Sequence, residues 1–228
     1  MRDLRFHVED RLYEKWLARF DQLTHEAHTL FLYRDYWRGL VEMTQANDDI
    51  PPSTFFDALG VWYRTTQATS IRRQLALDPR SISFHNLLAD VSGHPEVMTR
   101  ERHVGLWKDD DPREWAREAW QREGNANYDR IAGSGKDMID PALSSVDLDR
   151  LVAIGEPVVT FVNKAVAHTD EEALGSTSTY AELNAVIDEL GELLKKYSSL
   201  LTATVVGSLA PVHQQEWREA FRVAWWKT

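Results

Sequence analysis

The chain has 228 residues, 43% of them hydrophobic and 27% charged, which is typical of a protein with a substantial buried core. It has no cysteine, so disulfides, thiolate nucleophiles and cysteine-ligated metals are excluded. The formal net charge of −10 argues against tight, non-specific binding to nucleic acids. The sequence shows neither a signal peptide nor an apolar run as long as a membrane span, so we expect a cytoplasmic protein without membrane association.

Apolar residues recur at three- and four-residue steps through the first part of the chain, which is the spacing of one face of an α-helix. The spacing predicts helices over residues 12–30, 33–41, 53–75 and 83–91. Ser53 or Thr54 is expected to cap the third helix, and Ser81 or Ser83 the fourth. The third helix is expected to bury Phe55, Phe56, Leu59, Trp62, Tyr63, Ile71 and Leu75.

Residues 95–142 have the least regular pattern. Asp111-Pro112 is expected to start a helix, and the glycine- and asparagine-rich stretches 124–127 and 133–135 are expected to form turns. So short a region is not expected to hold a core of its own. We interpret it as an irregular or helical elaboration between two helical blocks of a single domain, residues 1–228.

Regular spacing returns near residue 146. Gly155 and Pro157 interrupt it, so a helix either restarts at Pro157 or is kinked there. The clearest helix covers residues 183–201, whose near-heptad spacing suits bundle packing or a dimer interface. A last helix is expected to contain Trp217, Phe221, Trp225 and Trp226. No strand-like alternation is present, so the predicted fold class is all-α.

Residues 161–170 form the candidate functional segment. Lys164 and His168 are four positions apart, so on an α-helix they share one face. His168 falls on the flank of the apolar stripe near the helix end, where an imidazole can exchange protons. The same pair also suits a helix C-terminus, where cations complement the helix dipole. Spacing alone favours this structural role.

Three stretches in order, residues 70–88, 163–170 and 216–225, resemble HEPN-type proteins, in particular the AbiU-type abortive-infection branch. The resemblance covers residues from about 50 to 226. It implies an antiparallel helical bundle that often forms a homodimer and cleaves RNA without a metal. It also implies a role in phage defence or a toxin-like system, with an RNA substrate and a partner protein.

In HEPN nucleases an arginine, a polar residue and a later histidine assist attack of the ribose 2′-hydroxyl on the adjacent phosphate. The resemblance places the histidine at His168 and the polar residue at Asn163, but the arginine position holds Val162. Valine carries no charge and donates no hydrogen bond. We therefore expect a degenerate motif and an uncertain catalytic status.

Another cation is needed if the motif is active. Lys164 is a partial substitute, because lysine lacks the planar fork of arginine. Arg72 or Arg73, on a neighbouring helix, is the other candidate. Adjacent arginines point about 100° apart on a helix, so we expect at most one of them to reach the site.

Other patterns point to no metal or cofactor. His25 and His28 are three positions apart, whereas helical zinc pairs are typically four apart. Residues 109–111 are three aspartates without the spacing of a calcium loop. Two alternatives to a nuclease remain open: a non-catalytic scaffold or interaction module of the same fold, and a bundle that binds a small ligand or nucleotide.

Overall fold

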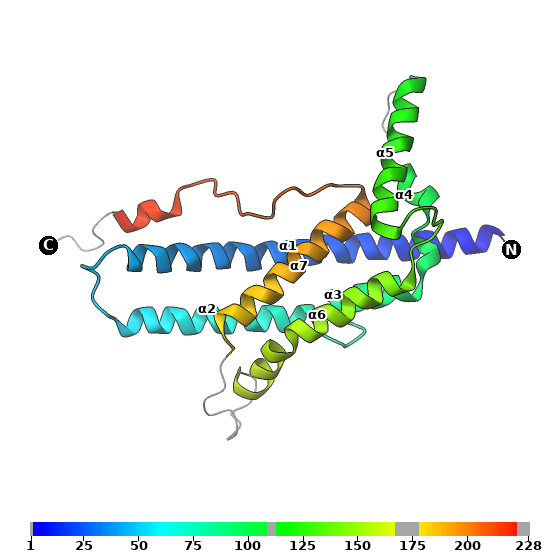
Figure 1. Cartoon of the computed structure of the whole chain (residues 1–228). Coiled ribbons are helices and arrows are strands. Elements are labelled where there is room, and N and C mark those ends of the chain that lie inside the picture. The colour runs from blue at the N-terminus through cyan, green and yellow to red at the C-terminus, as the bar shows by residue number, and fades with distance from the viewer. Residues whose placement is uncertain (1, 109–112, 167–177, 223–228) are drawn as a thin grey trace.

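The computed structural model describes residues 2–108, 113–166 and 178–222, which are mostly helical, with a long extended stretch over residues 203–216 (Figure 1). These residues include one isolated antiparallel bridge, Thr99 with Met138, and no strand, which confirms the all-α class. No described helix combines the length and the apolar character needed to span a membrane. The α-helices are α1 (Arg2–Gln45), α2 (Thr54–Gln74), α3 (Phe84–Gly93), α4 (Arg100–Leu106), α5 (Glu114–Ala132), α6 (Pro141–Phe161) and α7 (Tyr180–Thr202).

Helix α1 runs the length of the bundle as one helix of 44 residues, and α2 returns beside it (Figure 1). The prediction of two helices, over 12–30 and 33–41, is therefore wrong. The chain has no proline or glycine between residues 30 and 33, so nothing stops the first helix there. Similarly, α6 continues through Gly155 and Pro157, so the predicted restart at Pro157 does not occur.

Side chains cap the helices where the sequence indicates. The hydroxyl of Ser53 accepts from Phe55 N at 3.2 Å, and that of Ser83 accepts from Asn86 N at 3.1 Å. Thr179 and Glu182 form a reciprocal capping box at the start of α7. These bonds satisfy backbone donors that the first turn of each helix leaves unpaired.

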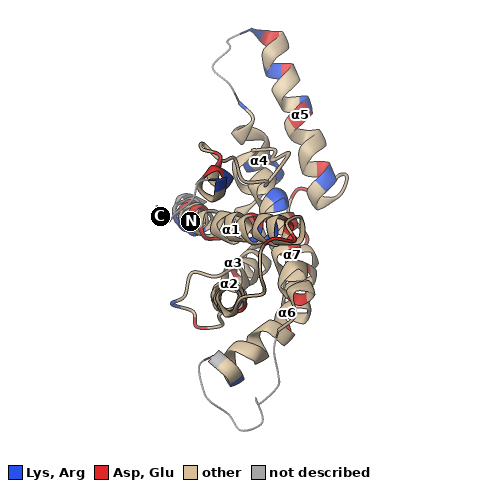
Figure 2. Ribbon diagram, turned by 90° about the vertical axis from the view of Figure 1, so that its left-hand side faces the viewer, with Lys and Arg blue, Asp and Glu red and all other residues tan. Residues whose placement is uncertain are grey.

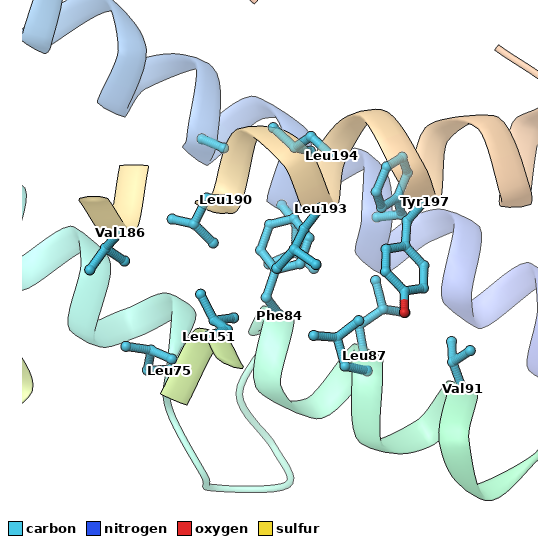
Figure 3. Packing of buried hydrophobic residues seen from close by; sticks show 14 of the residues in the cluster. Leu75, Phe84, Leu87, Val91, Leu151, Val186, Leu190, Leu193, Leu194 and Tyr197 are labelled. Carbon is cyan, nitrogen blue, oxygen red and sulfur yellow. The ribbon is translucent and has the colours of Figure 1, made fainter. Parts of the chain in front are cut away.

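Helix α7 supplies the centre of the core, as its heptad spacing predicts. Figure 3 shows its apolar side chains facing those of α3, with Leu75, which caps the end of α2, and Leu151 of α6 beside them. The stripe predicted over 183–201 is buried throughout and packs within the bundle. Its residues are Leu183, Val186, Ile187, Leu190, Leu193, Leu194, Tyr197, Leu200 and Leu201.

The first half of α2 is more exposed than its sequence predicts. Phe55 and Trp62 are 57% and 58% exposed, whereas Ile71 and Leu75 are buried as expected. Here α1 and α2 extend beyond most of the bundle (Figure 1), and α7 contacts this half of α2 through Tyr180, which lies against Gly60, Tyr63 and Arg64. We call the four exposed side chains of this region the aromatic face: Tyr33, Phe55, Val61 and Trp62.

The elaboration between residues 95 and 142 is helical, and α5 projects from the bundle (Figure 1). The turn predicted at residues 124–127 is wrong, because these residues lie inside α5. Gly124 instead lets α4 approach, since a Cβ there would lie 3.1 Å from Trp107 and from the Val104 backbone. The second predicted turn is confirmed, with φ of 92° at Gly133 and 70° at Gly135. The predicted helix start at Asp111-Pro112 lies outside the described residues.

A polar network joins α4, α5 and α7 at the base of this projection. His103 Nδ1 lies 2.9 Å from Leu200 O, and its Nε2 lies 3.3 Å from Trp107 Nε1. Asn127 Oδ1 lies 3.0 Å from the same Nε2 and accepts a hydrogen bond from the Ser199 hydroxyl. His103 is fully buried. Burial lowers its pKa below the ordinary value of 6.5.

Acidification is therefore expected to weaken the fold through His103. The unfolded chain binds a proton near pH 6.5 and the folded chain only at lower pH, so this contribution is complete above 6.5. It declines as the pH falls from 6.5 toward the folded pKa. Urea unfolding of wild type and His103→Gln between pH 8 and 5 measures it. The stability advantage of wild type should shrink toward pH 5, and a constant difference would contradict the assignment.

The chain after α7 runs back along α1 and ends in a 3₁₀ helix, Trp217–Arg222, with no buried residue (Figure 1). Trp217 packs against Gly39, where any Cβ would overlap its ring, and His213 lies 2.7 Å from the Asp35 carboxylate. Trp217 and Phe221 of the predicted aromatic helix therefore lie in a 3₁₀ helix at the surface. Trp225 and Trp226 lie outside the described residues.

Candidate functional site

A cavity of about 630 Å³ lies between the end of α2, the loop that follows it and the outer face of α6. The two helices approach closely here because α6 has a glycine at the contact, and a Cβ on Gly155 would overlap the Leu75 side chain. The lining residues are Arg72, Arg73, Leu75, Ala76, Leu77, Asp78, Ser81, Val152, Glu156, Val159, Thr160 and Asn163.

Two of the predicted site residues meet at one end of this cavity. Arg72 Nε donates to Asn163 Oδ1 at 2.7 Å, across 91 positions of sequence. Asn163 belongs to a π-helical turn, Val162–Val166, that follows α6 directly. Such turns are rare and frequently occur at functional sites. The bond fixes the arginine while leaving four of its five guanidinium N–H donors for a ligand.

The other predicted cations are close by. Arg73 lines the same cavity, whereas the hydrogen bond to Asn163 comes from Arg72, so the expectation that at most one arginine reaches the site stays a prediction. Lys164 is exposed on the π-helical turn. These three side chains form no ion pair with a carboxylate of the described residues.

Elsewhere acidic and basic residues are interspersed along the helices (Figure 2), and many of the cations are ion-paired. Arg80, on the loop after α2, binds Asp78 with two hydrogen bonds, which lower the pKa of that carboxyl. Arg19 and Arg34 are likewise paired, with Asp90 and Asp188 at 2.6 Å. The cavity therefore combines two arginines without an ion pair, Arg72 and Arg73, with two carboxylates, Glu156 and the paired Asp78.

The position that the HEPN resemblance assigns to arginine is part of the core. Val162 is 2% exposed, so this position does not face the cavity. Arg72 instead brings a guanidinium to the neighbouring Asn163. His168 lies outside the described residues, five positions after Asn163 in the sequence.

Both flanks of the segment 167–177 attach to α2. On one side Arg72 holds Asn163. On the other side the Arg64 guanidinium lies over the ring of Tyr180, the first residue of α7, at 5.1 Å, and Tyr63 lies 5.9 Å from the same ring. Helix α2 thus positions the residues on either side of the segment that contains His168.

Sequence reasoning missed two polar residues of the cavity, Glu156 and Thr160. Thr160 Oγ1 donates to Glu156 Oε1 at 3.0 Å. Both share a face of α6 with Asn163, at offsets of seven and three positions. Because residues three and seven positions apart share one face of an α-helix, the sequence could have predicted that Thr160 and Glu156 lie beside Asn163.

Two other patterns, His25 with His28 and residues 109–111, were not expected to bind a metal. His25 and His28 are exposed on α1, and residues 109–111 lie outside the described residues. Among the described residues, no three His, Asp or Glu side chains converge as metal ligands.

The cavity combines donors for an anion with an apolar wall, an arrangement suited to an organic phosphate. Comparisons of the chain with models of protein families, with curated proteins and with solved structures find no match.

Proposed function

We propose that the protein is a HEPN-like, metal-independent endoribonuclease in which Arg72 and Asn163 bind the scissile phosphate and His168 transfers protons. The bond between Arg72 and Asn163 carries this proposal. It joins Asn163, at the polar position of the motif, to the guanidinium of Arg72. The arginine position of the motif itself holds Val162. A guanidinium beside the phosphate would stabilise the charge that builds up on its oxygens in the transition state.

The proposed reaction needs only proton transfer and charge stabilisation. The ribose 2′-oxygen bonds to phosphorus as the bond from phosphorus to the 5′-oxygen breaks. The 2′-hydroxyl loses its proton and the departing 5′-oxygen gains one, which leaves a 2′,3′-cyclic phosphate and a 5′-hydroxyl. Imidazole suits this exchange because its ordinary pKa lies near neutrality.

The biological role that we propose rests on the resemblance: RNA cleavage in phage defence or a toxin-like system, by a homodimer that also has a partner protein. The aromatic face supports a protein–protein contact. Two of its four exposed side chains, Tyr33 and Trp62, line one groove between α1 and α2, and exposed apolar surface commonly marks interaction sites.

A second candidate is a non-catalytic interaction module of the same fold. Val162 favours it, because a buried valine replaces the family's arginine. In this case Arg72 and Asn163 would only join α2 to α6, and the aromatic face would be the functional surface.

Incubation of purified protein with total RNA in EDTA separates the two. We expect wild type to cleave RNA in EDTA and His168→Ala to be inactive, since loss of a general acid–base group costs about 100-fold or more. Thermal unfolding of both proteins checks that the variant is folded. No cleavage by wild type would favour the interaction module, and cleavage by His168→Ala would reject the role of the histidine.

A further inference from the structure

The cavity is larger than a phosphate group requires. Its volume of about 630 Å³ is within the range of about 300–1,000 Å³ found for small-ligand sites. Arg72 and Asn163 occupy one end, and the remainder extends along α6 as far as Val152. A phosphate bound to Arg72 and Asn163 would leave this part of the cavity unoccupied.

The walls of this remainder are apolar and partly open to solvent. Leu77 and Val152 are 68% and 41% exposed, although both line a concave site. Leu75, Ala76 and Val159 complete the apolar lining. A flat nucleobase would cover such side chains, and its faces are apolar enough to gain from that contact.

One carboxylate lies among these walls. Glu156 shares a face of α6 with Asn163 and precedes it by seven residues, or about 10 Å along the helix. This separation is comparable to that between the phosphate of a nucleotide and the far edge of its base. Glu156 accepts from Thr160 and forms no ion pair within the described residues. Its two oxygens keep unused lone pairs, and a carboxylate only accepts hydrogen bonds.

We propose that this pocket binds the base on the 5′ side of the scissile phosphate and selects guanine through Glu156. Guanine presents two parallel donors, N1–H and the N2 amino group, which match the two oxygens of a carboxylate. Adenine has an acceptor at N1 that would face the carboxylate, and cytosine and uracil each offer a single donor there. The inference rests on the proposed function for RNA as substrate, and it adds the base specificity of the site.

Calorimetric titration of the full chain with the four nucleoside 3′-monophosphates tests the pocket. The guanosine nucleotide should bind about tenfold more tightly than the adenosine nucleotide, as one bidentate base contact provides. Glu156→Gln should remove this preference and keep the affinity for the adenosine nucleotide, which also verifies folding. Glu118→Gln, an exposed change on α5, should alter neither affinity. Equal binding of all four nucleotides, no binding, or a preference that survives Glu156→Gln would overturn the inference.

The outcome separates this inference from the nuclease proposal. Guanine preference that depends on Glu156, in a protein that cleaves no RNA, supports the pocket and overturns the catalytic role. RNA cleavage without any guanine preference supports the nuclease and overturns the pocket.

Discussion

Arg72→Ala is expected to slow RNA cleavage by about 100-fold or more, the usual effect of removing one group that stabilises transition-state charge. The Arg72 side chain is exposed and donates its hydrogen bond to Asn163, so its loss should leave the core intact. Arg72→Lys should restore part of the rate, because it returns the charge without the planar fork. Initial rates on a short labelled RNA, measured in EDTA, provide the comparison.

Arg80→Ala is the matched control for this prediction. Arg80 lies on the loop after α2, and Asp78 already neutralises it at 2.8 Å. Its removal should leave the cleavage rate unchanged, whereas a general decrease of positive charge would affect both variants alike. Wild-type cleavage by a folded Arg72→Ala protein would reject the composite site and leave Lys164 or Arg73 as the cation.

Asp147→Ala is expected to lower the free energy of unfolding by about 3 kcal/mol, as for other buried ion pairs that lose one partner. Asp147 is 3% exposed and lies between α6 and α7. Lys196 Nζ approaches it at 2.6 Å, and the Tyr197 hydroxyl donates to it at 3.0 Å. The substitution leaves a buried hydroxyl without its acceptor and a partly buried ammonium without its counterion. Urea unfolding, followed by circular dichroism, measures the change.

Two further variants show whether burial causes this effect. Glu192→Ala breaks the exposed pair with Lys195, at 2.8 Å, and should change the unfolding free energy by less than about 1 kcal/mol. Tyr197→Phe removes one hydrogen bond to Asp147 and should cost about 1 kcal/mol. If Asp147→Ala costs no more than Glu192→Ala, the buried network does not stabilise the α6–α7 contact.

The spacing of apolar residues predicted the helices whose apolar face packs against other helices. The stripe of α7 and the Ser53 and Ser83 caps follow from local sequence, because each depends on neighbouring residues. The exposure of Phe55 and Trp62 could not be predicted, since it depends on which other helices reach that half of α2. Gly124 was misread because a glycine in a turn and a glycine at a helix contact look alike in sequence.

The candidate site was predictable in residue type but not in arrangement. Asn163 and the two arginines follow from the sequence and its resemblance, yet their contact depends on how closely α2 approaches α6. Gly155 permits that approach, although in sequence it looked like a helix breaker. Glu156 carried no motif of its own. The structure shows that Glu156 lines the same cavity as Arg72 and Asn163.

The attachment of both flanking residues to α2 has a thermodynamic consequence. Trp62 on the aromatic face and Arg72 at the cavity belong to the same continuous helix, ten residues or about 15 Å apart. A protein bound at Trp62 that shifts this helix would also move the contacts to Asn163 and Tyr180. Linkage then requires reciprocity: whatever factor such a partner adds to RNA affinity, RNA adds to the affinity for the partner.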